Sequence, residues 1–216
     1  MTAVAGEVVW TIIVAGGGGR RYGAAKQYEP LGPGRVLDLA VATARRASDG
    51  VVVVVPAEDV ATEGGVAGGR TRAESVRNGL AAVPAEATIV CVHDAARPLA
   101  SAELFRRVID AVTTGVDGVV PAIAVADTIK LVDGDGTVVD TPPRERLVAV
   151  QTPQAFRAAV LRRAHAAGLD GTDDASLVEH LGGRVVAVPG EAWNGKITTP
   201  EDLDRARDWL ARSAYA

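Results

Sequence analysis

One stretch decides the fold: Ile12-Ile13-Val14-Ala15-Gly16-Gly17-Gly18-Gly19-Arg20-Arg21, which Lys26-Gln27-Tyr28 follows five residues later. An apolar strand runs here into four glycines and then into three cations. Glycine has no Cβ, so its backbone N–H groups can turn toward a ligand, and such a concave set of donors binds anions. The cations indicate a ligand with several negative charges. The stretch therefore predicts a triphosphate-binding loop directly after a buried strand, where α/β proteins place their ligands.

Two better-known glycine loops do not fit this stretch. The dinucleotide fingerprint needs glycines at relative positions 1, 3 and 6, and every start in the run meets Arg20, Arg21 or Tyr22 instead. The P-loop needs Gly-Lys-Ser/Thr, but the Gly195-Lys196 pair is followed by Ile197. A dinucleotide-dependent oxidoreductase is thereby excluded. The remaining alternative is a surface turn with incidental arginines.

The composition indicates one domain, residues 1–216, that binds neither nucleic acid nor a membrane. With 27 acidic and 23 basic side chains the net charge is −4, which creates no field that attracts nucleic acid. No apolar run reaches the length of a membrane span, and no export signal is visible. The single cysteine, Cys91, cannot form an internal disulfide and lies in an apolar run, so we expect a core residue of a cytoplasmic protein.

Apolar runs rich in Val and Ile alternate with helical patterns along the chain. The pattern predicts strands at 8–15, 51–56, 87–93 and 184–189, and helices at about 37–47, 72–83, 101–112, 153–169, 174–181 and from 199 to the end. Ser101 and Thr199 are the expected N-caps of two of these helices. The alternation predicts an α/β fold with a doubly wound, mostly parallel sheet, whose ligands bind beyond the carboxyl ends of the strands.

The middle of the chain predicts a projecting β-hairpin arm at about 127–150. Thr128–Val132 and Thr137–Asp140 flank Asp133-Gly134-Asp135-Gly136, and Asp-Gly pairs favour tight turns. Because an isolated two-stranded ribbon is marginal in water, we expect the arm to pack on a second subunit. The alternative is a hairpin folded back on its own sheet.

Two further motifs fall at a predicted helix start and a predicted strand end. Gly68-Gly69-Arg70-Thr71-Arg72-Ala73-Glu74-Ser75 is a candidate for contacting base, sugar or phosphate, unless its charges are merely solvated. Asp94 is a candidate ligand of Mg²⁺ or of a sugar hydroxyl, and Arg97 a candidate phosphate clamp. An internal Asp94–Arg97 pair is the alternative.

The three histidines carry no metal-ligand pattern. His93 is expected to point to the opposite face from Asp94, so we interpret it as structural. His165 and His180 lie on predicted helices without the spacing of a zinc site.

Taken together, these segments resemble the 2-C-methyl-D-erythritol 4-phosphate cytidylyltransferase family of the non-mevalonate isoprenoid pathway. The matching segments occur in order and span roughly residues 8 to 212: Gly17–Arg21, Lys26-Gln27-Tyr28, Gly69–Ser75, Asp94-Ala95-Ala96-Arg97-Pro98, Asp127-Thr128, Thr152-Pro153-Gln154 and Lys196–Asp202. Each motif alone is a weak indication of this family, whereas the complete set in this order is specific to it.

The resemblance implies a nucleotidyltransferase-like Rossmann-type fold and a reaction in which methylerythritol 4-phosphate attacks CTP and releases pyrophosphate. It implies catalytic roles for Arg21, Lys26 and Lys196, and a homodimer joined through the arm. It also implies magnesium, mainly on the CTP phosphates, with Asp94 as its candidate ligand on the protein. The CTP-binding residues implied are Ala15, Gly16, Gly17, Gly69, Arg72, Ser75 and Ala95. Those implied for the polyol phosphate are Asp94, Arg97, Thr152 and, from the neighbouring subunit's arm, Thr128 and Arg144.

Three positions depart from the family pattern. The family usually has Ala-Ala-Gly where this chain has Ala15-Gly16-Gly17, and its spacing from Arg21 to Lys26 is usually longer. An acidic or small residue is common where this chain has Arg70.

Two rival functions remain open from the sequence. Ribitol 5-phosphate cytidylyltransferase shares the fold and the reaction, although it typically has valine where this chain has Ala96. A catalytically silent nucleotide-binding module is the other rival, and the intact Arg21, Lys26, Asp94 and Lys196 argue against it.

Overall fold

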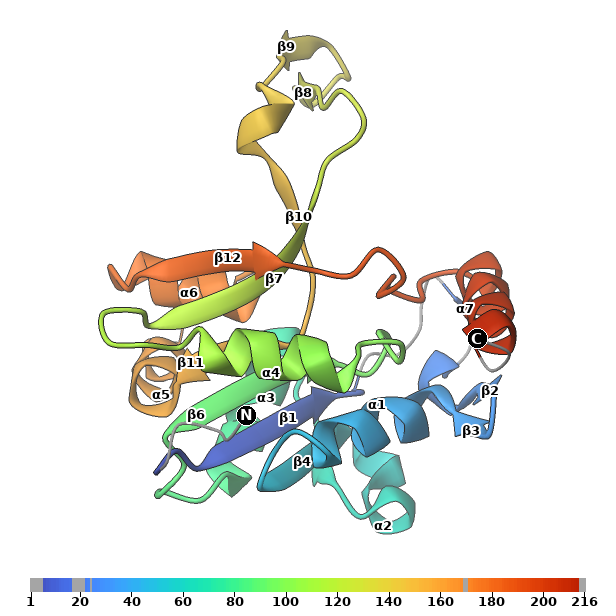
Figure 1. Cartoon of the computed structure of the whole chain (residues 1–216), viewed down its shortest axis with the longest axis vertical. Coiled ribbons are helices and arrows are strands. Elements are labelled where there is room, and N and C mark those ends of the chain that lie inside the picture. Colours follow the sequence, from blue (N-terminus) through green and yellow to red (C-terminus); the bar gives the residue numbers. More distant parts are fainter. Residues whose placement is uncertain (1–5, 17–21, 24, 169–170, 214–216) are drawn as a thin grey trace.

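The computed structural model describes residues 6–16, 22–23, 25–168 and 171–213 (Figure 1). An eight-stranded sheet runs in the order β10-β7-β11-β6-β1-β4-β5, and β12 also pairs with β7. Its strands are β1 Val9–Val14, β4 Gly50–Val55, β5 Val66–Ala67, β6 Ile89–Asp94, β7 Gly118–Ala124, β10 Val148–Val150, β11 Gln154–Arg157 and β12 Val185–Pro189. The strands predicted at 8–15, 51–56 and 87–93 are the adjacent strands β1, β4 and β6, and the strand predicted at 184–189 is β12, which pairs with β7.

The sheet is mostly parallel, as predicted. β1 lies parallel to β4 and β6, β4 to β5, and β12 to β7. Among the described strands of this sheet, only β10 and β11 run antiparallel to their neighbours.

The predicted helix at 153–169 is wrong at its beginning. Gln154–Arg157 is strand β11, with Gln154 opposite Val92 and Arg157 opposite Ile89, and the helix starts only at Ala158. β11 fills the space between β6 and β7, where Ala155 and Phe156 are fully buried. Tertiary pairing therefore overrides the local preference of this segment.

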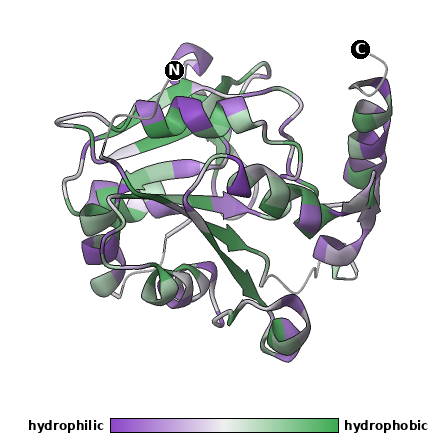
Figure 2. Cartoon of the chain, turned by 60° about the horizontal axis from the view of Figure 1, so that its bottom comes forward, coloured by the Kyte–Doolittle hydropathy of each residue, from purple (hydrophilic) through white to green (hydrophobic). Residues whose placement is uncertain are grey.

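The helices cover both faces of the sheet. They are α1 Val36–Arg45, α2 Val60–Glu63, α3 Arg72–Ala82, α4 Ala102–Asp110, α5 Ala158–Ala166, α6 Asp174–His180 and α7 Pro200–Ser213, with 3₁₀ turns at Lys26–Tyr28, Ala57–Asp59 and Arg144–Arg146. Residues of α1 and α4 join one buried cluster, and residues of α3, α5 and α6 join the other. Figure 2 shows the hydrophobic residues concentrated on the strands, while the helices carry both kinds.

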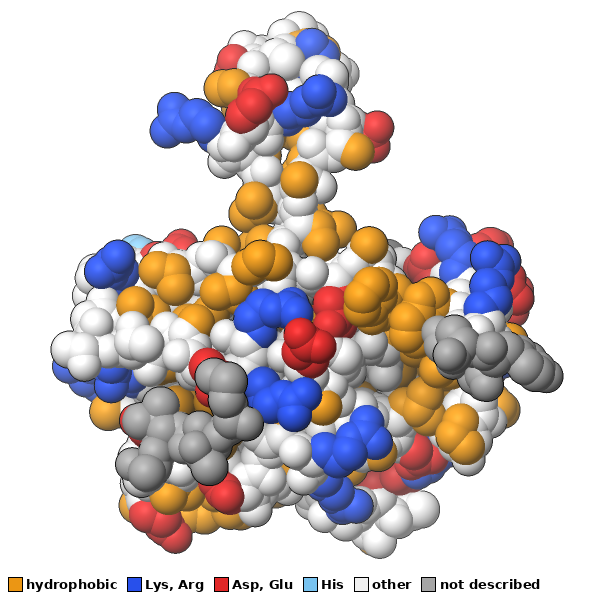
Figure 3. Space-filling view, in the orientation of Figure 1, with side chains coloured by type: hydrophobic (Ala, Val, Ile, Leu, Met, Phe, Trp, Pro, Cys, Tyr) orange, Lys and Arg blue, Asp and Glu red, His pale blue; other side chains and the backbone are white. Residues whose placement is uncertain are grey.

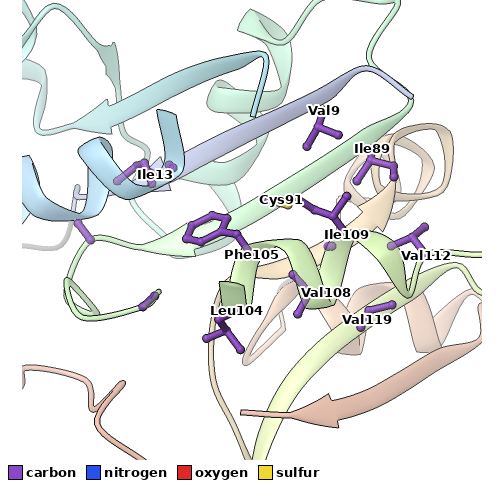
Figure 4. Packing of buried hydrophobic residues seen from close by; sticks show 14 of the residues in the cluster. Val9, Ile13, Ile89, Cys91, Leu104, Phe105, Val108, Ile109, Val112 and Val119 are labelled. Atoms are coloured by element: carbon purple, nitrogen blue, oxygen red, sulfur yellow. The ribbon is translucent and has the colours of Figure 1, made fainter. Parts of the chain in front are cut away.

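The alternation of side chains along β1 explains the two clusters. Ile13 packs into the α1/α4 cluster and its neighbour Ile12 into the α3/α5/α6 cluster. Figure 4 shows the first cluster, in which Phe105 and Val108 of α4 lie against the strands beside Cys91. Cys91 is fully buried, as predicted, and burial raises the pKa of its thiol to about 12.

A third, smaller cluster holds α7 against the hairpin β2 Pro30–Leu31 and β3 Gly34–Arg35. Beside it, the rings of Trp193 and Trp209 stack at 5.7 Å and 17°. These two rings line a cavity of about 650 Å³. Trp193 is 42% exposed although it is large and apolar.

The arm leaves the sheet at the end of β7 and returns through β10 (Figure 1). Strands β8 Leu131–Val132 and β9 Val138–Asp140 pair antiparallel near its tip. Asp133 accepts hydrogen bonds from the N–H groups of Asp135 and Thr137, and Gly136 has a φ of +89°, a value that favours glycine. Figure 3 shows hydrophobic side chains along the stem of the arm and on the body around its base.

No helix in the described part of the chain is long and apolar enough to span a bilayer.

Candidate active site

Three predicted segments meet at the carboxyl ends of the parallel strands. The N–H of Ala15 donates to Val54 O (2.7 Å), that of Gly68 to Val55 O (2.7 Å) and that of Ala95 to Val14 O (3.0 Å). Backbone hydrogen bonds therefore connect the segments that follow β1, β4 and β6. Ala95 is only 1% exposed, and its side chain belongs to the α1/α4 cluster beneath these strand ends.

The glycine run is described only at its start. Gly17 and Arg21 lie outside the described residues. At Gly16 an added Cβ would meet Gly68 Cα and Ser75 Oγ at 3.6 Å, which is ordinary contact distance. The fold therefore accepts the family's usual alanine at this position, and close approach does not explain the extra glycine.

The Gly69–Ser75 segment forms a tight turn into α3. A Cβ on Gly69 would lie 2.2 Å from Glu74 Cβ, so only glycine fits there. The Ser75 hydroxyl accepts from Gly69 N (3.0 Å) and donates to Thr71 O (3.0 Å), and Ser75 is 3% exposed. Ser75 thus shapes the loop. Arg70 pairs with Glu74 at the surface (3.1 Å), an interaction that the sequence did not indicate.

Four charged side chains, here called the strand-end cluster, meet beyond β6: Arg72, Asp94, Asp174 and Lys196. Lys196 Nζ lies 2.6 Å from Asp94 Oδ2, and Arg72 Nε lies 3.3 Å from Asp94 Oδ1. Arg72 NH1 lies 2.7 Å from Asp174 Oδ2. The two cations balance the two carboxylates, although Asp94 and Lys196 are 102 residues apart in sequence.

The cluster keeps Asp94 ionised. Burial acts to raise the pKa of Asp94, but the charges of Arg72 and Lys196 outweigh it and hold that pKa well below its usual range. Burial likewise acts to lower the pKa of Arg72, and the carboxylates of Asp174 and Asp94 raise it above its ordinary value. The site therefore presents fixed charges at neutral pH.

A second network connects Thr152, His93 and Arg97. The Thr152 hydroxyl lies 3.0 Å from Asp94 N, whose hydrogen it accepts, and 3.0 Å from His93 Nδ1. His93 Nε2 lies 3.1 Å from Arg97 O. Since a carbonyl only accepts, Nε2 carries the proton and Nδ1 accepts from Thr152. Burial lowers the pKa of His93 to about 4, which keeps the ring neutral.

This network clarifies three predictions. His93 tilts against Phe105 of α4 while Asp94 faces Arg72 of α3, so the two side chains lie on opposite faces as expected. Arg97 forms no ion pair with Asp94 in the described chain; its guanidinium donates to Asn194 O (2.8 Å) and Val150 O (3.4 Å). The Thr152 hydroxyl already forms hydrogen bonds with Asp94 N and His93 Nδ1, and these bonds hold the end of β6 in place.

The segment that carries Lys196 is fastened on both sides. Before it, the Asn194 side chain donates to Thr152 O (2.9 Å). After it, Ile197 N donates to Ala96 O (2.8 Å), and Lys26 Nζ donates to Ile197 O (2.8 Å). Lys26 and Lys196 thus flank one short piece of backbone.

The cap of α7 holds the same segment at its far end. Asp202 accepts from Thr198 and Thr199 N–H groups (2.8 and 2.9 Å), and Thr199 Oγ1 accepts from Asp202 N (3.4 Å). The hydrogen bond from the Thr198 hydroxyl lowers the pKa of Asp202 to about 2. The predicted N-cap at Thr199 is confirmed.

Thr128 and Arg144 do not join these residues within one chain. Both lie on the arm, which rises away from the sheet in Figure 1. Arg144 NH1 donates to Ala126 O (2.8 Å), so it contacts its own arm.

Sequence reasoning missed Asp174, His165 and Glu191. Asp174 is fully buried between Arg72 and His165 Nε2 (2.9 Å), yet Asp173-Asp174 looked only like a helix start. Glu191 is 5% exposed and accepts from the N–H and hydroxyl of Ser101, the cap of α4. The sequence signal that could have pointed to Asp174 and Glu191 is that each acidic residue lies beside an apolar run.

The described residues contain no group of three or more His, Cys, Asp and Glu side chains that could hold a metal ion. Asp94 is the one carboxylate of the cluster on a segment predicted to bind ligand, and both its oxygens contact cations. With both oxygens of Asp94 in contact with cations, a Mg²⁺ ion here would be held mainly by substrate phosphates, which commonly complete its shell where a site offers one or two carboxylates. The arrangement can position phosphates and stabilise their charge.

Similarity in sequence and in structure agrees with this geometry. The sequence model of the family described as 2-C-methyl-D-erythritol 4-phosphate cytidylyltransferase matches residues 9–212. A protein of that name from Frankia casuarinae is 43% identical, with 97% of this chain and 84% of that protein covered. The bifunctional enzyme IspD/IspF of Solidesulfovibrio magneticus is 45% identical over 90% of this chain, and this chain spans 55% of its length.

Two solved structures have the same architecture. The 4-diphosphocytidyl-2C-methyl-D-erythritol synthase of Anaerococcus prevotii superposes with a TM-score of 0.84 at 32% identity, covering 96% of this chain and 100% of that one. The 2-C-methyl-D-erythritol 4-phosphate cytidylyltransferase of Thermus thermophilus gives 0.77 at 37% identity, covering 93% and 98%.

Proposed function

This chain belongs to the 2-C-methyl-D-erythritol 4-phosphate cytidylyltransferase family, and we propose that it transfers the cytidylyl group of CTP to 2-C-methyl-D-erythritol 4-phosphate in the non-mevalonate isoprenoid pathway. A phosphate oxygen of the alcohol phosphate bonds to the α-phosphorus of CTP as the bond to the leaving pyrophosphate breaks. One observation supports this most directly: two cations converge on an ionised aspartate at the carboxyl end of β6.

Positioning and charge stabilisation carry this chemistry. Phosphoryl-type transfer needs little covalent participation from the protein, and its barrier falls when cations face the charge that develops on the phosphate oxygens. We assign this role to Arg21, Lys26 and Lys196. The bonds that fasten the Lys196 segment support it, because preorganised charges need no rearrangement during the reaction.

The nucleotide is assigned to the ends of β1, β4 and β6. The backbone of Ala15, Gly16 and Gly17, with that of Gly69 and Ala95, holds cytosine and ribose, and Arg72 lies beside them. Ser75 acts here by holding the Gly69 loop in shape, since its hydroxyl is occupied.

The polyol phosphate is assigned to Asp94, Arg97 and the arm. The guanidinium of Arg97 contacts only backbone carbonyls in the described chain, so its charge is available to a phosphate. Thr152 contributes by fixing the backbone of Asp94. Thr128 and Arg144 reach the neighbouring subunit's site in a homodimer.

Magnesium is assigned to the CTP phosphates, with Asp94 the protein group nearest to that role. When bound, it neutralises phosphate charge that the cations alone only partly offset.

The homodimer and the compartment belong to the same proposal. The arm exposes apolar side chains that a second copy of the chain would cover. The free, buried Cys91 is consistent with a cytoplasmic protein.

Pyrophosphate release from CTP and Mg²⁺, measured with each alcohol phosphate, tests the function. We expect turnover with 2-C-methyl-D-erythritol 4-phosphate to exceed that with ribitol 5-phosphate. Faster turnover of ribitol 5-phosphate would assign the chain to the sister activity. Binding of CTP without turnover of either alcohol would leave a silent nucleotide-binding module.

A further inference from the structure

Asp174 is a buried charge that the proposed chemistry does not use directly. The residue is 0% exposed and begins α6. Its Oδ1 faces His165 Nε2 at 2.9 Å, and its Oδ2 faces Arg72 NH1 at 2.7 Å. Taking a carboxylate out of water costs several kcal/mol unless it is paired and hydrogen-bonded, so both contacts are needed to keep it there.

Arg72 is anchored at two separate nitrogens. Its Nε contacts Asp94 and its NH1 contacts Asp174. A guanidinium held at one nitrogen can swing about that contact, whereas contacts on two nitrogens to two carboxylates fix its plane. Of these two contacts, the one from Arg72 to Asp94 (3.3 Å) is longer and weaker than the one to Asp174 (2.7 Å).

The position of Arg72 requires such an anchor. It is the first residue of α3, where the positive end of the helix dipole disfavours a cation. Asp174 lies at the first residue of α6, where the same effect favours a carboxylate. The side chain of Arg72 is 26% exposed while that of Asp174 is 1% exposed, so the carboxylate is the more deeply buried partner and part of the Arg72 side chain reaches the surface.

We propose that Asp174 is a positioning residue, which fixes the guanidinium of Arg72 against Asp94 so that it faces the nucleotide. This inference rests on the proposed cytidylyl transfer, because that function places Arg72 beside CTP. Asp174 acts through Arg72 and does not touch the substrate.

A double-mutant cycle tests the inference with Asp174→Asn, Arg72→Gln and the double variant. Asp174→Asn keeps the shape of the side chain, and Arg72 can turn to solvent, so we expect a folded protein. We expect its KM for CTP to rise about tenfold, a size typical of coupled neighbours. The KM for the alcohol phosphate should stay within about twofold, and the double variant should bind CTP as Arg72→Gln does.

Asp173→Asn is the matched control. Asp173 is the adjacent carboxylate, caps Ser176 N (3.0 Å) and contacts Gln154, and asparagine caps equally well. This variant should keep the wild-type KM for CTP. An equal rise in the control, or effects of Asp174→Asn and Arg72→Gln that multiply in the double variant, would overturn the positioning role.

Crystal structures of the wild type and of Asp174→Asn separate this inference from the proposed function. We expect Arg72 to leave Asp94 in the variant; if it stays in place, the inference fails. Should the wild type turn over neither alcohol phosphate, the proposed function fails, and the position of Arg72 still decides whether Asp174 anchors it.

Discussion

The arm and the strand-end cluster place side chains in opposite environments. On the arm, Leu131 and Val139 are 56% and 55% exposed although they are apolar. In the cluster, Asp94 and Asp174 are 8% and 0% exposed although they are charged. The buried charges have counter-ions within the same chain, whereas nothing in the described chain covers these arm residues.

The difference shows which part of the molecule is complete on its own. The cluster is neutral in sum and braced by hydrogen bonds, so one chain suffices to build it. The arm has only a short β8–β9 ladder and no core of its own. Substitutions in the cluster should therefore act within a subunit, and substitutions on the arm should act between subunits.

Lys26→Ala should give the largest effect, and it acts within a subunit. The lysine holds Ile197 O beside Lys196, and its charge faces the transition state in the proposed reaction. We expect kcat to fall about a hundred- to a thousandfold with little change in melting temperature. Lys130→Ala, on the exposed arm, is the matched control and should stay within about threefold of wild type. Near-normal turnover of Lys26→Ala would remove Lys26 from the mechanism.

Leu131→Glu should give the next largest effect, and it acts between subunits. Burying a polar group without a hydrogen-bond partner costs about 1–3 kcal/mol in proteins, and twofold symmetry places the substitution in the interface twice, so the dimer loses roughly 3 kcal/mol. We expect the dissociation constant of the dimer, measured by analytical ultracentrifugation, to rise about a hundredfold. Leu181→Glu makes the same change at a leucine that is 47% exposed on the body and should leave the dimer intact. Equal effects of both variants would contradict the arm interface.

Acidification should lower the free energy of unfolding of the chain through protonation of His93. Burial lowers its pKa to about 4 in the folded chain, against about 6.5 when unfolded. The unfolded chain thus binds more protons between these values, and stability is lost as the pH falls from about 6.5 toward 4. Between pH 7 and pH 5 the free energy of unfolding should drop by roughly 2 kcal/mol from this group. Urea titrations of His93→Gln should show a drop smaller by that amount; an unchanged pH dependence would exclude His93.

Arg144→Ala should give the smallest effect of the four. Its guanidinium contacts only its own arm within one chain, so its proposed role lies in the partner's site. We expect the KM for the alcohol phosphate to rise about tenfold, the loss of one charged hydrogen bond, with CTP affinity unchanged. An equal loss of both affinities would argue against a cross-subunit contact.

The sequence predicts strands and helix caps well where the local pattern of side chains determines them. The continuous apolar runs mark β1, β4 and β6, and Ser101 caps α4 by accepting from Leu104 N. It fails at Gln154–Arg157, because pairing with β6 and β7 decides that segment. A pairing partner more than 30 residues away leaves no mark in local periodicity.

The residues of the site likewise divide into those that the sequence predicts and those that depend on the folded chain. Motif resemblance brought Asp94 and Lys196 together, and the structure places them in contact. Asp174 was overlooked because an acidic residue at a helix start is explained by the helix alone. The occupied hydroxyls of Thr152 and Ser75 were equally invisible, since a side chain's partners depend on the folded chain.

The stacked pair Trp193–Trp209 makes the protein its own optical reporter. Trp193 lies three residues before Lys196, on the segment whose Ile197 carbonyl binds Lys26. Two of the chain's three tryptophans are in this pair, so the pair contributes to the ultraviolet emission. Any shift of the Lys196 segment alters the ring overlap and hence the fluorescence. Stopped-flow mixing can therefore follow the segment in real time without an attached dye.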